Sequence, residues 1–119
     1  MAAPVVFFEI GSKDAAALAG FYGDVLGWRF AELGAARTIV GGHEGGPAGM
    51  LNALGHPPET YVMVYAQVED LAVALAQVAQ SGGAKLVGPH PLPDGRHFAW
   101  VRDPAGNLLG LVTPPPTAG

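Results

Sequence analysis

The pattern of apolar and polar positions occurs twice along the chain, about 56 residues apart. Two apolar runs that contain β-branched and aromatic residues, Val5–Ile10 and Tyr61–Val68, predict strands. Each run is followed by an acidic turn and an alanine-rich stretch whose apolar residues fall at helical spacing, first over Asp14–Leu26 and again from Asp70 onward. A glycine ends each stretch, and a return strand follows. The repeat therefore predicts two copies of one unit, an arrangement that usually builds a joint cavity.

The first copy contains signals for both ends of its helix. Ser12 lies in the turn before the helix and is a candidate N-cap, and Gly27 can adopt the left-handed conformation that ends a helix. The apolar residues at helical spacing in this stretch are Leu18, Phe21, Tyr22, Val25 and Leu26. Short strands are predicted at Trp28–Glu32, Arg37–Val40 and Gly49–Leu54.

The second copy follows a proline-rich linker, His56–Glu59, which cannot continue a helix or a central strand. Asp70 is expected to cap the second helix, whose predicted apolar face comprises Leu71, Ala74, Leu75, Val78 and Ala79. The remaining elements are strands at Ala84–Gly88, Arg96–Arg102 and Leu108–Thr113, an irregular turn over Pro89–Gly95 and a hairpin turn over Asp103–Asn107. The expected fold is α+β, with two β-α-β-β-β modules (residues 5–55 and 59–113) in a single domain of residues 1–119.

Composition narrows the class of protein. Half of the 119 residues are hydrophobic and 13% are charged, which argues against disorder. The net charge of −4, without a basic run, argues against nucleic-acid binding, and the absence of cysteine excludes disulfides, thiolate metal sites and cysteine nucleophiles. No apolar run approaches the ~20 residues of a membrane span, and the N-terminus lacks a signal-peptide pattern. We therefore expect a soluble cytoplasmic protein with no membrane contact, and the Ala, Gly and Pro content is typical of a bacterial genome rich in G and C.

Three segments carry a further pattern: Phe8-Glu9-Ile10, the run from Ala19 to Trp28 with its Phe-Tyr and Leu-Gly-Trp elements, and the run from Phe98 to Leu108 with Asp-Pro-Ala-Gly-Asn. With them the chain resembles the vicinal oxygen chelate superfamily of glyoxalases, bleomycin resistance proteins and extradiol dioxygenases. The resemblance implies a mixed sheet whose two modules form a cup. It also implies a homodimer, which a monomeric mass at micromolar concentration would contradict. These segments are fold elements, so they specify no reaction.

Metal-dependent members of that superfamily bind a divalent ion through His, Gln or Glu on the first and last strand of each module. The resemblance places these positions at Phe7, Met63 and Gly110, with the fourth near Met50–Asn52. Phenylalanine and glycine side chains cannot bind a metal, and a thioether is poorly suited to the ions that such sites use. We therefore expect no standard metal centre and no cofactor. Phe7 and Met63 would instead suit the cup to an apolar or aromatic ligand.

Polar side chains near these positions are candidates for binding or chemistry. Glu9 shares strand parity with Phe7, so it can point into the cup as a partly desolvated general base. The alternative is that Glu9 faces solvent or a backbone partner. Tyr61 and Tyr65 share parity with Met63 and could orient a ligand through their hydroxyls, or they could simply pack in the core.

The remaining candidates lie in the second module and in a loop of the first. His97 could act as an acid or base near pH 7, although a structural or surface histidine is the commoner case. Trp100 could line the pocket or belong to the core. His43 and Glu44 lie in the glycine-rich segment Gly41–Gly49, which could be a lid or a solvated loop. They could also bind a metal at displaced positions together with His97.

Three functional hypotheses follow. The leading one is a small metal-free protein that binds a hydrophobic or aromatic molecule between the modules or at a dimer seam, through Phe7, Glu9, Tyr61, Met63, Tyr65, Trp100 and Gly110. The alternative is a lyase, an isomerase or a dioxygenase-like enzyme, either cofactor-free with Glu9 or His97 as acid or base, or with displaced metal ligands. The third is an interaction module without a small ligand. Elemental analysis of protein purified without chelator separates the metal-binding version from the others.

Overall fold

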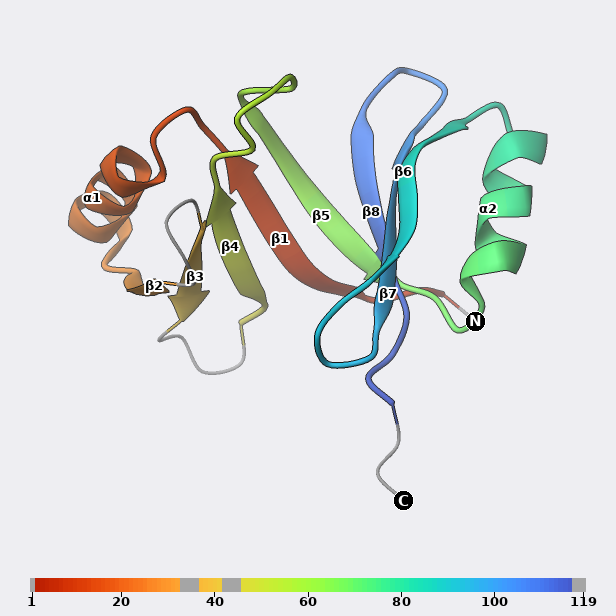
Figure 1. The fold of residues 1–119 in the computed structure, drawn as a ribbon, viewed down its shortest axis with the longest axis horizontal. Helices are drawn as coiled ribbons and strands as arrows, with labels where there is room; N and C mark the ends of the chain where they lie inside the picture. The colour runs from red at the N-terminus through yellow and green to blue at the C-terminus, as the bar shows by residue number, and fades with distance from the viewer. Residues whose placement is uncertain (1, 33–36, 42–45, 117–119) are drawn as a thin grey trace. The chain divides into compact units, whose positions relative to one another are not determined.

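The computed structural model of the protein describes residues 2–32, 37–41 and 46–116. In these residues the order β-α-β-β-β occurs twice (Figure 1), which confirms the predicted α+β fold. The elements are β1 (Val5–Gly11), α1 (Ala15–Leu26), β2 (Arg29–Glu32), β3 (Arg37–Gly41), β4 (Ala48–Asn52), β5 (Tyr61–Gln67), α2 (Leu71–Gln80), β6 (Ala84–Pro91), β7 (His97–Arg102) and β8 (Leu108–Val112).

The chain divides into two compact units. The N-terminal unit comprises residues 7–63, and the C-terminal unit comprises residues 64–119 together with residues 1–6. The strands β1 and β5 therefore each contribute residues to both units. In the C-terminal unit the Gln67 N–H donates to the Pro4 carbonyl at 2.8 Å, so the start of β1 lies beside the end of β5.

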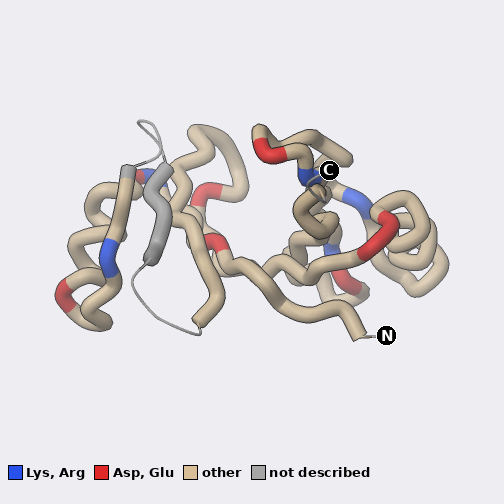
Figure 2. The backbone as a smooth tube through the Cα atoms, turned by 90° about the horizontal axis from the view of Figure 1, so that it is seen from below, with Lys and Arg blue, Asp and Glu red and all other residues tan. Residues whose placement is uncertain are grey.

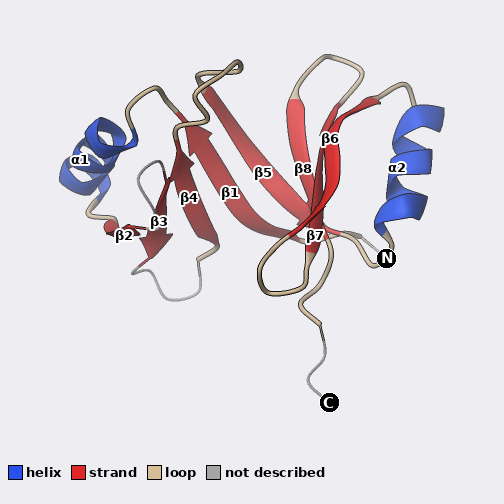
Figure 3. Ribbon diagram, in the orientation of Figure 1, coloured by secondary structure: helices blue, strands red, loops and turns tan. Residues whose placement is uncertain are grey.

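The N-terminal unit carries one helix on four strands in the order β2-β3-β4-β1 (Figure 3). Strands β1 and β4 are parallel, and the other pairs are antiparallel. The core beneath α1 contains Ile10, Ala15 and Leu51, with Phe8 packed against it. Because side chains alternate along a strand, Phe7 and Glu9 lie on the opposite face of β1 from this core.

The ends of α1 are set by local hydrogen bonds. The N-cap is Asp14, whose Oδ1 accepts from the Ala17 N–H at 3.1 Å, so the prediction of Ser12 was wrong. Ser12 instead accepts from the Asp14 N–H at 3.0 Å, one step before the cap, because the helix begins at Ala15. Gly27 ends the helix with φ of 71°, as predicted.

The apolar face of α1 is wider than the surface that the strands bury. Leu18 and Tyr22 pack against the core. Phe21, Val25 and Leu26, however, are 52–60% exposed, although they share the helical spacing that predicted this helix. The physical reason is that these apolar residues spread around much of the helix, whereas the strands cover one side of it.

The C-terminal unit has the order β5-β8-β7-β6, with β5 and β8 parallel. Helix α2 packs on a core of Leu71, Ala99, Val101 and Leu111. Asp70 caps α2 as predicted, because its Oδ1 accepts from the Val73 N–H at 3.0 Å.

Strand β6 is longer than predicted and includes residues assigned to an irregular turn. It extends through Pro89 to Pro91, and only the residues from Leu92 to Arg96 form the turn, where the Leu92 N–H donates to the Arg96 carbonyl at 2.7 Å. Proline is tolerated in β6 because it is the edge strand of its unit and pairs irregularly with β7. The sequence pattern of prolines did not distinguish an edge strand from a turn.

The turn between β7 and β8 has the predicted hairpin structure. The Asp103 carboxylate accepts hydrogen bonds from the N–H groups of Ala105 and Asn107, each at 2.9 Å, and from Asn107 Nδ2 at 3.0 Å. Arg102 Nη1 donates to the Gly106 carbonyl at 2.7 Å. These contacts close the turn on itself, which explains why the five-residue motif could be identified from sequence.

The same contacts predict a pH dependence of the turn. Hydrogen bonds from Asn107, its side chain first, hold the pKa of Asp103 below its ordinary value. Because the native pKa is the lower one, the stabilisation is fully present above the ordinary value of about 3.9 and is lost as the pH falls through the native pKa. We expect an NMR titration to give Asp103 a depressed pKa that Asn107→Ala raises. An Asp103 pKa that Asn107→Ala leaves unchanged would contradict this.

Candidate functional site

A buried carboxylate is the main polar feature of the N-terminal unit. Glu9, in the middle of β1, is 1% exposed. Among the side chains that the structure describes, no other charged or polar one falls in the buried class. Charged positions elsewhere are scattered along the described chain (Figure 2). Because burying a charge is costly unless hydrogen bonds compensate it, the surroundings of Glu9 are decisive.

Two neutral donors hold the Glu9 carboxylate. The Tyr61 hydroxyl donates to Oε2, and Asn52 Nδ2 donates to the same oxygen at 3.2 Å. The three residues come from three strands of one unit, β1, β4 and β5. We call Glu9, Asn52 and Tyr61 the Glu9 cluster.

Gly11 makes room for this cluster. A Cβ atom added at Gly11 would overlap the Tyr61 ring. Gly11 also pairs with Asn52 in the parallel register of β1 and β4. The side chains of Glu9, Asn52 and Tyr61 therefore meet on one face of the strands. The missing side chain therefore lets the Tyr61 ring lie where its hydroxyl reaches Glu9.

Apolar side chains surround the Glu9 cluster. Phe7 and Met50 are half-buried; Phe7 shares the face of Glu9 on β1, and Met50 pairs with Glu9 across β4. Met63, two residues after Tyr61 and on the same face of β5, is 2% exposed. We call the six residues Phe7, Glu9, Met50, Asn52, Tyr61 and Met63 the Glu9 face. Phe7, Asn52 and Tyr61 are half-buried, whereas Glu9 itself is 1% exposed.

The corresponding place in the C-terminal unit is occupied by aromatic residues. Tyr65 stands where the repeat places Glu9, and its hydroxyl accepts a hydrogen bond from Trp100 Nε1 at 2.7 Å. Both side chains are buried. Gly110 pairs with Tyr65 on one side and Trp100 on the other, and a Cβ there would overlap the Tyr65 ring. Within the C-terminal unit the structure therefore brings these three predicted site residues together.

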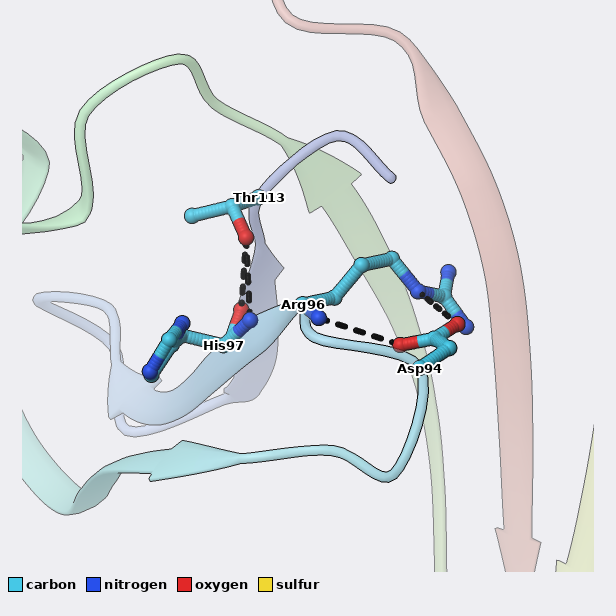
Figure 4. Close-up of polar contacts among 4 residues, drawn as sticks. All are labelled: Asp94, Arg96, His97 and Thr113. Carbon is cyan, nitrogen blue, oxygen red and sulfur yellow. Dashed lines mark hydrogen bonds and ion pairs between the residues drawn. The ribbon is translucent and has the colours of Figure 1, made fainter. Parts of the chain in front are cut away.

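His97 is not brought together with the other candidates of its unit. Its side chain is exposed, and its backbone N–H donates to Thr113 Oγ1 at 2.9 Å. Figure 4 shows the imidazole pointing away from the neighbouring pair of Arg96 and Asp94, whose Nε and Oδ2 lie 2.8 Å apart. The Arg96 backbone N–H, which bonds to the Asp94 carboxylate, holds the pKa of Asp94 below its ordinary value.

Asn52 is the cluster residue that the sequence did not identify. Sequence reasoning placed a fourth metal position near Met50–Asn52 but did not pair Asn52 with Glu9. The useful signal would have been the parallel register of β1 and β4, which sets Gly11 opposite Asn52. The other loop candidates, His43 and Glu44, lie outside the described residues.

The side chains at the expected metal positions do not suit a divalent ion such as Zn or Mn. Phe7 offers a hydrocarbon ring, Met63 a buried thioether, and Gly110 no side chain beneath the Tyr65 ring. No group of three or more His, Cys, Asp or Glu residues that could hold a metal occurs in the described part of the chain. None of the described helices combines the length and apolar character needed to cross a membrane.

Comparisons with known proteins place this geometry in context. A family model described as a glyoxalase-like domain matches residues 6–112. The chain is similar to methylmalonyl-CoA epimerase from Mycobacterium tuberculosis, with 14% identity, coverage of 94% of this chain and 88% of that one, and a TM-score of 0.70. The chain is also similar to a variant of the Streptomyces coelicolor methylmalonyl-CoA epimerase in complex with 2-nitronate-propionyl-CoA, with 18% identity, coverage of 95% of this chain and 98% of that one, and a TM-score of 0.65. For a glyoxalase/bleomycin resistance protein/dioxygenase superfamily member from Vibrio splendidus 12B01 the identity is 21%, the coverage is 94% of this chain and 99% of that one, and the TM-score is 0.67.

At these identities the likeness shows a shared fold alone. No curated protein matches the chain.

Proposed function

Since the chain belongs to the glyoxalase-like domain family, as its resemblance led us to expect, we propose that it binds a small hydrophobic or aromatic molecule without a metal ion. The ligand would lie on the Glu9 face of the N-terminal unit. The observation that carries this proposal is the Glu9 carboxylate, 1% exposed and hydrogen-bonded by Tyr61 and Asn52. Ligand sites typically combine an apolar lining with a few well-placed polar groups, and the Glu9 face has both.

The hydrogen-bonding character of the Glu9 cluster indicates which class of small molecule it would bind. An ionised carboxylate accepts hydrogen bonds and donates none, and Glu9 accepts from Tyr61 and Asn52. A neutral aromatic molecule with an N–H or O–H donor would suit both this acceptor and the side chains of Phe7 and Met63. An anionic group near Glu9 would be repelled in a poorly hydrated environment. We therefore favour neutral aromatic donors over carboxylates.

A thermal-shift series on the metal-free protein tests this proposal. We expect phenol and benzamide to raise Tm, because a ligand at 100 times its Kd stabilises by about 2.7 kcal/mol. Toluene, which lacks a donor, and benzoate, which is anionic, should shift Tm less. Glu9→Gln should remove the preference for donors, because a neutral amide no longer attracts them as a carboxylate does.

Glu69→Gln is the matched control, since Glu69 is exposed and lies in the C-terminal unit. It should bind like the original protein. Failure of every aromatic compound to stabilise the protein would count against the proposal, and a stoichiometric metal ion after purification would overturn its metal-free part. Methylmalonyl-CoA, the ligand in one of the similar epimerase structures, belongs in the series as a test of an acyl-CoA ligand.

The homodimer and the cytoplasmic location predicted from the sequence remain parts of this proposal. The exposed apolar side chains of α1, Phe21, Val25 and Leu26, are a surface that a second copy could cover.

A further inference from the structure

We propose that Met50 is a modification site, where oxidation of the thioether to the sulfoxide by a peroxide lowers the affinity of the Glu9 face for its ligand. This inference rests on the proposed function, because the ligand concerned is the aromatic molecule bound on that face. It goes further in assigning a regulatory chemistry to one residue of the site.

Methionine supplies all the sulfur of this chain, because the sequence has three methionines and no cysteine. Two of them, Met50 and Met63, lie in the part of the chain that the structure describes, and both belong to the Glu9 face. Oxidation converts the apolar thioether of methionine into a polar sulfoxide. Oxidation of either of these sulfur atoms therefore changes the lining of the Glu9 face.

Exposure distinguishes the two methionines. Met63 is 2% exposed, so a peroxide in solution has little access to its sulfur atom. Met50 is half-buried and meets solvent in part. Since the oxidant must reach the sulfur atom, Met50 reacts before Met63.

The strand register places Met50 beside the polar groups of the site. Met50 pairs with Glu9 across β1 and β4, and it lies two residues before Asn52 on the same face of β4. Its strand is held on both sides, because β4 pairs with β1 and with β3. Oxidation therefore acts through the side chain of Met50 and not through a shift of the strand.

A sulfoxide at position 50 weakens binding in either orientation of the side chain. If the side chain stays on the face, the sulfoxide oxygen is a second acceptor beside the Glu9 carboxylate, and it competes for the donors Tyr61 and Asn52. If the side chain turns toward water, which its three rotatable bonds allow, the ligand loses apolar contact area.

The reaction balances with a peroxide as the only co-reactant. The sulfur lone pair attacks one oxygen of hydrogen peroxide, so that the S–O bond forms and the O–O bond breaks. The sulfur is oxidised by two electrons, and the leaving hydroxide takes up the proton of the transferred oxygen and departs as water. Methionine sulfoxide reductases reverse the change.

Treatment of the purified protein with hydrogen peroxide, removal of the peroxide, and titration with phenol and with benzamide test this inference. Peptide mass spectrometry should find the added oxygen on Met50 while Met63 is unchanged. We expect the Kd for both compounds to rise about 10-fold or more, in the range that one altered group in an apolar pocket contributes. Reduction by methionine sulfoxide reductases should restore the original Kd.

Three variants isolate the contribution of Met50. Met50→Leu keeps an apolar side chain of similar volume that cannot be oxidised in this way, so peroxide should leave its Kd unchanged. Met50→Gln has a polar side chain of similar length and should bind both compounds weakly without peroxide. Met63→Leu should respond to peroxide like the original protein.

Several results would overturn the inference: oxidised Met50 with an unchanged Kd, an equal response of Met50→Leu to peroxide, or oxidation of Met63 before Met50. Urea unfolding of the oxidised protein is the accompanying measurement, and weaker binding that arises from loss of the fold would also overturn it. In each of these cases, binding by the unoxidised protein leaves the proposed function standing. If the unoxidised protein binds neither compound, the proposed function and this inference both fail.

Discussion

Gly110→Ala is expected to destabilise the protein by about 1–3 kcal/mol, the usual cost of forcing extra volume into a packed site. The added Cβ would overlap the ring of Tyr65, which cannot move easily because it is buried and hydrogen-bonded to Trp100 at 2.7 Å. Urea unfolding at 25 °C, followed by circular dichroism, measures the change.

The matched control is Gly20→Ala, the same substitution where nothing lies within 4 Å of the new Cβ. Gly20 lies inside α1, where alanine is the better helix former, so this variant should gain about 0.5–1 kcal/mol. If both substitutions change the free energy of unfolding equally, the Tyr65 ring is not what excludes a larger residue at position 110.

The expected loss gives Gly110 a structural explanation. The resemblance placed a metal ligand at this position, and the sequence showed only that glycine cannot serve as one. In the structure the Tyr65 ring covers Gly110, next to Trp100 on the neighbouring strand. The glycine therefore leaves the space that the Tyr65 ring occupies.

Glu9→Met is expected to abolish the preference for neutral aromatic donors while leaving stability unchanged or raising it by about 0.5–2 kcal/mol. Replacing a buried charge by an apolar side chain of similar size removes its desolvation cost. The former partners Tyr61 and Asn52 are half-buried, so both can turn toward water. Urea unfolding and the thermal-shift series measure the two effects on one variant.

The neighbouring residue provides the control. Ile10→Ala changes the opposite face of β1, beneath α1, and should cost about 2–5 kcal/mol as an ordinary core truncation. If Glu9→Met costs as much as Ile10→Ala, then Glu9 stabilises the fold, and the proposed site loses its main support.

Much of the fold could be predicted from the sequence because its signals are local. Asp70 caps α2, Gly27 ends α1 and the Asp103–Asn107 turn closes on itself, each through groups no more than four residues apart. Strand parity is equally local: Val62 is 73% exposed, whereas Met63 beside it is 2% exposed. The wrong predictions concerned the N-cap of α1, which is Asp14 and not Ser12, and the end of β6, which continues to Pro91 as an edge strand.

The sequence by itself determined the repeated β-α-β-β-β order and the family, and it identified Glu9 and Tyr61 as separate candidates. Only the tertiary structure decided that Glu9 and Tyr61, 52 positions apart, form a hydrogen bond. It also decided that Asn52, 43 positions from Glu9, donates to the same carboxylate. It also decided that Gly11 makes room for this contact and that Gly110 lies beneath Tyr65. The physical reason is that elements follow from neighbours in the chain, whereas a site follows from the register of strands that are distant in it.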